Sequence, residues 1–345
     1  MDQEYTKRLK KIEAELERWL PAKFESWAEN VFPGYEKNVN AMALNTLLEP
    51  LKDILSRGGK RWRPLLMTLV CEAFGGGDSA VALSPLVEFC HNASLIHDDI
   101  EDESDKRRGK PAVHKIYGVD TAINSGTFFY FLSSACIESC APENRWRIYK
   151  LWTECMRRLH LGQATDIFWH RNISFVPETD EYYVMCSMKT GSLARFSAEL
   201  GAYAAGAPEE AARQFGEAAE KLGIGFQILD DVKNLTEGIP GKNRGDDIVE
   251  GKKSLPVLLY LNKFPEKREL VFNSFRTART IGLSTPEAED LIEILVSSGV
   301  LAEAEEKGAS LIEQSRKIFN ASECAGFPVN EKGRALLDGL IGLIS

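Results

Sequence analysis

The chain of 345 residues lacks several features that would place it in a specialised class of protein. No apolar run approaches the roughly 20 residues that a membrane helix needs, and the N-terminus is too highly charged for a signal peptide. The 42 basic and 51 acidic residues give a formal net charge of −9, so no basic excess is available to neutralise a nucleic-acid backbone. We therefore expect a soluble protein with no nucleic-acid partner and no insertion into a membrane.

Disulfide and thiolate-metal patterns are also missing. The seven cysteines are an odd number, and no two of them form a CxxC pair. Most stand in apolar or helical segments, so we expect reduced thiols in the core of a cytoplasmic protein. No Ser/His/Asp or Cys/His arrangement for nucleophilic catalysis is obvious.

Helical periodicity dominates, and strand signals are weak. Apolar residues recur at helical spacing between charges in residues 3–20, which predicts an amphipathic helix, and a second helix is predicted at 41–55. No internal repeat or low-complexity linker divides the sequence. We therefore predict an all-α fold in a single domain, residues 1–345, with an N-terminal packing or dimerisation helix region (1–40) and a helical bundle (41–345).

The stretch HNASLIHDDIEDESDKRRGKPAVHKIY places a dense acidic cluster just ahead of a basic one. In a helix, Asp98 and Asp102 share a face, and His91 sits two turns upstream of Asp98. Mg²⁺ prefers such carboxylates, takes one or two from the protein, and leaves its other positions to water and phosphate. Arg107 and Arg108 supply planar donors that hold phosphate at two points. For DDIED alone, an exposed charged helix end is an equally good interpretation.

A second acidic stretch, GIGFQILDDVKNL, favours the metal interpretation. Gln227, Asp230, Asp231 and Asn234 fall at i, i+3, i+4 and i+7, a single polar stripe that must face water or ions. If the two stretches face each other across a bundle, they form an acidic cage for metals that bridge a diphosphate. The alternative is an amphipathic surface helix, which explains poorly why the face carries only short acidic and amide side chains.

Basic residues near glycines offer further anion contacts. In SRGGKRWRPLL, two glycines precede Lys60, Arg61 and Arg63 at the start of an apolar helix, whose free N–H groups and adjacent charges suit a diphosphate. An exposed surface turn is the alternative there.

Lys189 and Thr190 stand at a glycine inside an apolar helix, where a buried lysine is costly unless it is paired. An exposed lysine is the commoner case. Lys242 and Lys252 belong to a polar, glycine-rich loop that could close over a ligand.

These motifs resemble, in order and approximate spacing, those of the trans-isoprenyl diphosphate synthases, and most closely the eukaryotic-type geranylgeranyl diphosphate synthases. The resemblance covers about residues 50 to 260 and is carried by GGKRWRP, HNASLIHDDIEDESDKRRGKPAVHKIYG, GQATDIFW, MKTG, GFQILDDVKN and GKNRGDD. It implies an isoprenoid-synthase-type helical bundle around a central apolar cavity, several Mg²⁺ ions per active site and a homodimer. Asn234 stands where the broader family has a third aspartate, a mark that the eukaryotic-type group shares.

The resemblance also implies roles for single residues. Isopentenyl diphosphate would be bound by Lys60, Arg63, His91 and Arg108. Mg²⁺ would be bound by Asp98, Asp102 and Asp230, with Asp99 and Asp231 in support. The allylic diphosphate would be held by Arg107, Lys189, Thr190, Gln227, Lys242 and Lys252.

The implied reaction condenses isopentenyl diphosphate with an allylic diphosphate. Breaking the allylic carbon–oxygen bond leaves a diphosphate anion and a carbocation, so the site must neutralise the first and keep water from the second. The released diphosphate can then remove the proton, so no protein base is required.

Three other classes remain open. A terpene cyclase would not need the second diphosphate site at GGKRWRP and RRG. An inactive partner subunit would be expected to lose DDIED or Lys189, and neither is lost. A carrier for long apolar chains would need a cavity but not two acidic stripes.

Product length depends on the depth of the apolar pocket. On the predicted DDIED helix, Ala93 and Ser94 lie one turn above the first aspartate and are too small to stop a growing chain. We therefore expect a deeper floor of Tyr130, Phe131 and His160, positions to which the resemblance also points. The expected product is geranylgeranyl diphosphate, with farnesyl or geranylfarnesyl diphosphate as alternatives.

Overall fold

The computed structural model describes residues 3–21, 27, 31, 32, 40–238, 244–282 and 285–344. Helices dominate this part of the chain, and its only strands form two short antiparallel hairpins. The all-α prediction is thereby confirmed.

The chain divides into two compact units, each described here by itself. Unit 1 comprises Met1–Glu154, Phe196–Phe215 and Ala321–Leu340, and unit 2 comprises Cys155–Arg195, Gly216–Asn320 and Ile341–Ser345. The single domain expected from the sequence stays a prediction.

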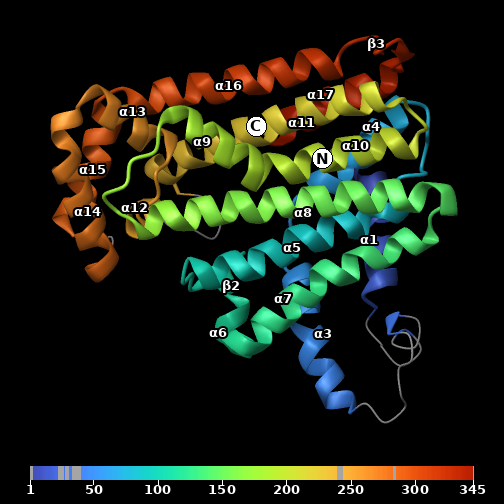
Figure 1. Cartoon of the computed structure of the whole chain (residues 1–345), viewed down its shortest axis with the longest axis horizontal. Coiled ribbons are helices and arrows are strands. Elements are labelled where there is room, and N and C mark those ends of the chain that lie inside the picture. The colour runs from blue at the N-terminus through green and yellow to red at the C-terminus, as the bar shows by residue number, and fades with distance from the viewer. Residues whose placement is uncertain are drawn as a thin grey trace. The chain divides into compact units, whose positions relative to one another are not determined.

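The N-terminal helices, coloured from blue to green in Figure 1, belong to unit 1. Their bounds are α1 (Gln3–Trp19), α3 (Ala41–Ser56), α4 (Trp62–Ala73), η1 (Val81–Leu83), α5 (Ser84–Glu101), α6 (Val113–Tyr117), α7 (Val119–Ser134) and η2 (Ala135–Ser139). The hairpins of this unit are β1 (Lys106–Arg107) with β2 (Lys110–Pro111), and β3 (Glu323–Cys324) with β4 (Phe327–Pro328).

Unit 2 contains α9, α12 to α16 and two short turns of other helix types. Their bounds are α9 (Thr179–Cys186), the π-helical turn η3 (Ser187–Gly191), α12 (Asp246–Glu250), α13 (Leu255–Lys263), η4 (Pro265–Lys267), α14 (Arg268–Ile281), α15 (Pro286–Ser297) and α16 (Val300–Phe319). The division between the units falls within α8 (Pro142–Arg171), α10 (Ser192–Ala204), α11 (Glu209–Thr236) and α17 (Glu331–Ile344).

Helix α1 confirms the amphipathic helix predicted near the N-terminus, and its apolar face is buried in unit 1. Arg8 lies against α4, where its Nε donates to Oε1 of Glu72 at 2.7 Å. The Tyr5 hydroxyl donates to the carbonyl of Leu336 in α17 at 2.7 Å. Within unit 1, α1 is therefore a packing helix.

Helices α5 and α7 lie side by side in unit 1 (Figure 1) and place the first acidic stretch. Phe89 of α5 and Phe129 of α7 are fully buried, with ring centroids 4.5 Å apart. Further along, a Cβ at Gly126 would lie only 2.7 Å from Cε1 of His97, so the missing side chain allows the two helices to approach closely. This packing sets the position of the last turn of α5.

The core of unit 2 is formed by apolar residues of α13 to α16 together with buried residues of α9 and α11. Helices α11 and α16 touch at two glycines, since a Cβ at Gly225 would lie 2.8 Å from the carbonyl oxygen of Gly308. A side chain at either glycine would push these helices apart.

All seven cysteines are free, and six of them are buried. This agrees with the expected reduced thiols in the core. Among the described residues, no helix is both long and apolar enough to span a bilayer.

Gly201→Ala should destabilise the protein, because the added Cβ would lie 2.2 Å from the carbonyl oxygen of Met67. Overpacking of this kind costs roughly 1–3 kcal/mol. Thermal unfolding followed by circular dichroism measures the loss. The control is Gly342→Ala, where nothing lies within 4 Å and the higher helix propensity of alanine should stabilise the protein by up to about 1 kcal/mol. Equal melting temperatures for Gly201→Ala and the wild type would contradict this account.

Candidate active site

The first acidic stretch lies at the carboxyl end of α5, in unit 1. Asp98 and Asp99 stand in the last turn, and Asp102 is the C-cap. The helix dipole is negative at this end, so each carboxylate there is unfavourable by roughly 0.3–1 kcal/mol unless a positive charge lies nearby. The fold therefore leaves these acidic residues in need of cations.

Arg107 supplies one of these positive charges. Its Nε donates to Oδ1 of Asp99 at 2.8 Å, and its Nη2 lies 3.4 Å from Oδ2 of Asp98. Asp99 is fully buried, and burial raises its pKa even though Arg107 acts in the opposite direction. The side chain of Asp98 is 21% exposed, whereas that of Asp99 is 0% exposed.

The β1–β2 hairpin presents Arg107 and Arg108. Its two turn residues, Arg108 and Gly109, have φ of 53° and 76°, as in a type I′ turn, a left-handed conformation that is unfavourable for arginine. Arg57, which the sequence did not single out, donates to the carbonyl of Pro111 at 2.9 Å and pairs with Asp53. The hairpin is thereby tied to the end of α3.

The glycine turn before α4 divides its three basic residues. Lys60 is exposed and Arg63 lies over the Trp62 ring at 4.4 Å, whereas Arg61 is buried in a left-handed conformation. Arg61 pairs with Glu88 at 2.9 Å and Glu13 at 2.8 Å. It also donates to backbone carbonyls. Grouping Arg61 with the anion contacts was therefore wrong, because its donors hold the loop together.

His91 lies among four arginines. Burial lowers its pKa well below the usual value, and the positive charges of Arg63, Arg108, Arg107 and Arg61 lower it further. A neutral imidazole in such a positive field can donate to an anion. These neighbours favour a phosphate group rather than a cation beside His91.

The carboxylates at the end of α5 fit a divalent cation that keeps part of its own shell. Among the described residues, no three His, Cys, Asp or Glu side chains gather closely enough to hold an ion by themselves. Mg²⁺ does not require such a cage, because it binds one or two carboxylates and retains water or phosphate oxygens. In the described structure, Oδ2 of Asp99 is buried without a hydrogen-bond partner, which adds to the local need for positive charge.

The MKTG motif lies in unit 2 on the π-helical turn η3, between α9 and α10. Such turns are rare in proteins, and those that occur are often found at functional sites. Gly162 of α8 allows a close approach, since a Cβ there would lie 2.4 Å from the backbone nitrogen of Lys189. The Lys189 ammonium reaches Oδ2 of buried Asp166 at 2.5 Å. Asp166 thus compensates the charge of this partly buried lysine, whose role as a site residue stays a prediction.

Asp166 was not predicted as a site residue, although GQATD contains it. Burial raises its pKa, but the charges of Lys189 and Lys252 outweigh this and leave it below the usual value. Asp166 therefore stays ionised and fixes the lysine.

Thr190 begins a chain of hydrogen bonds that reaches the second acidic stretch. Its hydroxyl donates to Oε1 of Gln227 at 2.8 Å, and Nε2 of Gln227 donates to Oδ1 of Asp231 at 2.9 Å. The hydroxyl of Tyr182 donates to the other oxygen, Oδ2, at 2.7 Å. Tyr182, a fully buried residue of α9, was not singled out from the sequence and belongs to this group.

The second acidic stretch does not present one accessible stripe. Asp230 is exposed, but Asp231 and Asn234 are buried. Burial, together with Asp247, raises the pKa of Asp231 to about 7. The expectation that all four polar residues face water or ions is therefore wrong for Asp231 and Asn234, because hydrogen-bonding neighbours cover them.

Asn234 anchors the short helix α12. Its side-chain oxygen accepts from the backbone nitrogen of Asp247 at 3.2 Å, and its own carbonyl accepts from the nitrogen of Gly245 at 2.7 Å. Lys252, just beyond α12, pairs with Glu250 at 2.6 Å and lies 3.7 Å from Asp247. Lys242 lies outside the described residues.

The residues expected to limit product length have different surroundings. Tyr130 is buried and stacks on His97, with ring centroids 5.7 Å apart. Phe131 is 63% exposed in the single chain, and His160 is exposed as well. Of the two small residues on α5, Ala93 is fully buried, and the hydroxyl of Ser94 donates to a backbone carbonyl in its own helix.

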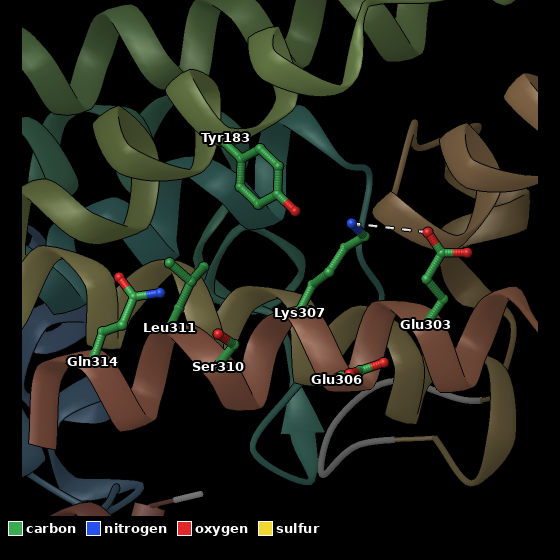
Figure 2. A pocket seen from close by; sticks show the side chains of 7 residues that line it. All are labelled: Tyr183, Glu303, Glu306, Lys307, Ser310, Leu311 and Gln314. Carbon is green, nitrogen blue, oxygen red and sulfur yellow. Dashed lines mark ion pairs between the residues drawn. The ribbon is translucent and has the colours of Figure 1, made fainter.

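A surface hollow of about 510 Å³ lies elsewhere in unit 2. Figure 2 shows Tyr183 of α9 above a row of α16 side chains that includes Lys307, with an ion pair to Glu303. Its lining contains none of the residues predicted from the motifs.

Comparisons with known proteins agree with these motifs. The polyprenyl synthetase family model matches residues 44–286. A geranylfarnesyl diphosphate synthase of Aeropyrum pernix is 32% identical over 304 residues, 84% of this chain and 91% of the relative. The geranylgeranyl pyrophosphate synthase penG of Penicillium crustosum is 32% identical over 298 residues, 84% of this chain and 82% of the relative.

A solved structure gives the same result. The polyprenyl synthase of Caulobacter crescentus CB15, complexed with calcium and isoprenyl diphosphate, is 26% identical with a TM-score of 0.73, and the match covers 96% of each chain. The resemblance inferred from the motifs is confirmed, and the chain belongs to the polyprenyl synthetase family.

Proposed function

We propose that this protein is a prenyltransferase that condenses isopentenyl diphosphate with an allylic diphosphate and releases a short-chain all-trans isoprenyl diphosphate. The observation that carries the proposal is the arrangement at the end of α5, where Asp98, Asp99 and Asp102 adjoin an arginine-bearing hairpin. Family membership and the names of the relatives support the same reaction.

The site must act differently on the two diphosphates, because only one of them is released from its carbon chain. Isopentenyl diphosphate keeps its diphosphate throughout and needs only to be held, for which Lys60, Arg63, His91 and Arg108 provide donors. The allylic diphosphate departs, and Arg107 with Lys189 and Thr190 would neutralise the charge that develops on it. Gln227, Lys242 and Lys252 complete the proposed set for this group.

We assign Mg²⁺ to Asp98, Asp102 and Asp230, with Asp99 and Asp231 holding the neighbouring side chains in place. When bound, the metal would supply the positive charge that stabilises a departing diphosphate. The burial of Asp99 and Asp231 and the accessibility of Asp230 support this division of roles. The calcium in the structure of the Caulobacter relative supports a divalent cation.

A homodimer is also proposed. On α7, Val119 and Ile123 are one helical turn apart and are 49% and 46% exposed. Large exposed apolar side chains on one face of a helix favour an association surface, and a second copy of the chain is the partner that the resemblance implies. A cytoplasmic location remains part of the proposal.

Incubation of the purified protein with Mg²⁺, isopentenyl diphosphate and dimethylallyl, geranyl or farnesyl diphosphate tests the function, with the products sized after dephosphorylation. We expect mainly geranylgeranyl diphosphate, with farnesyl and geranylfarnesyl diphosphate as alternatives. EDTA should abolish turnover. A hydrocarbon formed without isopentenyl diphosphate would instead identify a terpene cyclase, and no product from any substrate would support an inactive subunit or a carrier.

Asp98→Asn should lower turnover by about three orders of magnitude, or roughly 4 kcal/mol, because charge that stabilises the transition state through the metal is lost. Steady-state kinetics at saturating Mg²⁺ measure the change. Asp105→Asn is the matched control, since this exposed aspartate in the same segment pairs only with Lys115 among the ion pairs of the described residues. Near-normal turnover of Asp98→Asn would remove that residue from the proposed metal site.

The pKa of His91 should rise when a diphosphate binds. Four arginines now help to lower this pKa, and an anion bound among them would offset their charge. Histidine NMR titrations with and without inorganic pyrophosphate measure the shift. Without the anion, His91 should stay neutral as the pH falls through 6.5, its ordinary pKa. His114, whose neighbouring charges include Asp99 and Asp105, should respond less, and an unchanged His91 would contradict the assignment.

We also propose that Tyr130, Phe131 and His160 form the floor that limits product length. Tyr130→Ala should therefore lengthen the product, because it removes a large buried ring beside His97. Product sizing at fixed substrate ratio detects the added five-carbon units, while the dependence on Mg²⁺ should not change. Phe131→Ala and the double variant complete the series. Unchanged products in all three variants would place the floor elsewhere.

A further inference from the structure

The π-helical turn Ser187–Gly191 is costly to form, since its wider ring has poorer geometry than the α-helix on either side. Such a turn persists only where surrounding contacts determine it. Lys189 and Thr190, both within it, depend on its shape for the directions of their side chains.

Glu220 of α11 supplies those contacts. Its Oε1 accepts hydrogen bonds from the Ser187 hydroxyl and from Nη2 of Arg158, the latter at 2.7 Å. Its Oε2 accepts from Nη1 of Arg195 at 2.9 Å. Both carboxylate oxygens are thus used, one on the first residue of the turn and one on α10 just beyond it. Only 14% of the side chain is exposed, so water competes weakly for these bonds.

Two glycines seat the turn against the same part of α11. A Cβ at Gly191 would lie 3.0 Å from Cγ of Glu220, and a Cβ at Gly223 would lie 3.0 Å from Cα of Gly191. The backbone of the turn is therefore in direct contact with α11, and Glu220 stands at this contact.

We infer that Glu220 is a positioning residue, which fixes the conformation of the π-helical turn so that Lys189 and Thr190 can bind the allylic diphosphate. The identity of the substrate in this inference rests on the proposed function. The contacts that support it all lie within unit 2. Ser187, Arg158 and Arg195 act with Glu220 as one braced group. Nothing in this group needs to touch the substrate.

Glu220→Gln tests the inference, because glutamine keeps the shape of the side chain and loses the charge that two arginines share. We expect the KM for the allylic diphosphate to rise about tenfold or more, since small misplacements of binding groups are costly, whereas the KM for isopentenyl diphosphate stays within about twofold. Hydrogen exchange should become faster at the amides of residues 187–191. A merely structural role would lower stability without separating the two KM values.

Glu210→Gln is the matched control. This glutamate lies on the same helix, ten residues before Glu220, and pairs with an arginine, Arg213, but it is exposed. It should leave both KM values and the exchange of the turn unchanged.

Ser187→Ala covers the case in which Glu220→Gln does not fold. Loss of the single hydroxyl should raise the allylic KM about threefold, with the isopentenyl KM again unchanged. Equal effects on both substrates, or unchanged exchange at 187–191 in the folded variants, would overturn the inference. An inactive wild type would refute the proposed function instead, and the exchange measurement would still decide whether Glu220 braces the turn.

Discussion

Buried carboxylates constrain where several basic side chains of this protein lie. A buried charge is tolerated only where a partner compensates for its loss of water, and removal of one partner typically costs about 3–5 kcal/mol. Asp99 with Arg107, and Asp166 with Lys189, obey this rule within their own units. Glu220 obeys it with two arginines. Each compensation also fixes a basic side chain, and in the case of Arg107 and Lys189 the same contacts place groups that we propose to bind phosphate.

The sequence predicted what depends on local pattern. Helical periodicity identified the all-α fold and α1, and the order of the motifs identified the family. Both signals depend only on the order of residues along the chain. Partners from other elements could not be found in this way. The sequence did not distinguish Arg61 from its basic neighbours, although in the structure it pairs with Glu13 and Glu88. It also did not single out Tyr182, whose hydroxyl donates to Asp231. A hydrogen bond between residues 49 positions apart leaves no periodic signal in a single sequence.

Asn234 lies in the second acidic motif, but its side chain holds α12 by a hydrogen bond to the backbone of Asp247. An aspartate there could also accept the backbone hydrogen bond from Asp247, but it would add a third carboxylate close to Asp231 and Asp247. Burial and Asp247 already raise the pKa of Asp231 to about 7, so a further negative charge would be costly without a nearby cation. A neutral amide anchors α12 without that cost. A hydrogen bond to α12 and the charges of Asp231 and Asp247 therefore favour a neutral residue at this position.

The proposed treatment of the two substrates follows from the same electrostatics. Stabilisation that is equal in the ground state and the transition state does not raise the rate of the chemical step, so strong charge compensation is useful only where charge develops. His91 has several arginines around it, and their charges add to the effect of burial, which is the main cause of the low pKa of this histidine. Such a field can hold a diphosphate that never leaves. The end of α5 is different, because several carboxylates lie together at the negative pole of a helix, where a bound cation would be favourable in addition to Arg107. A site that needs cations in this way suits the diphosphate that departs, since metal and leaving group can then be bound together.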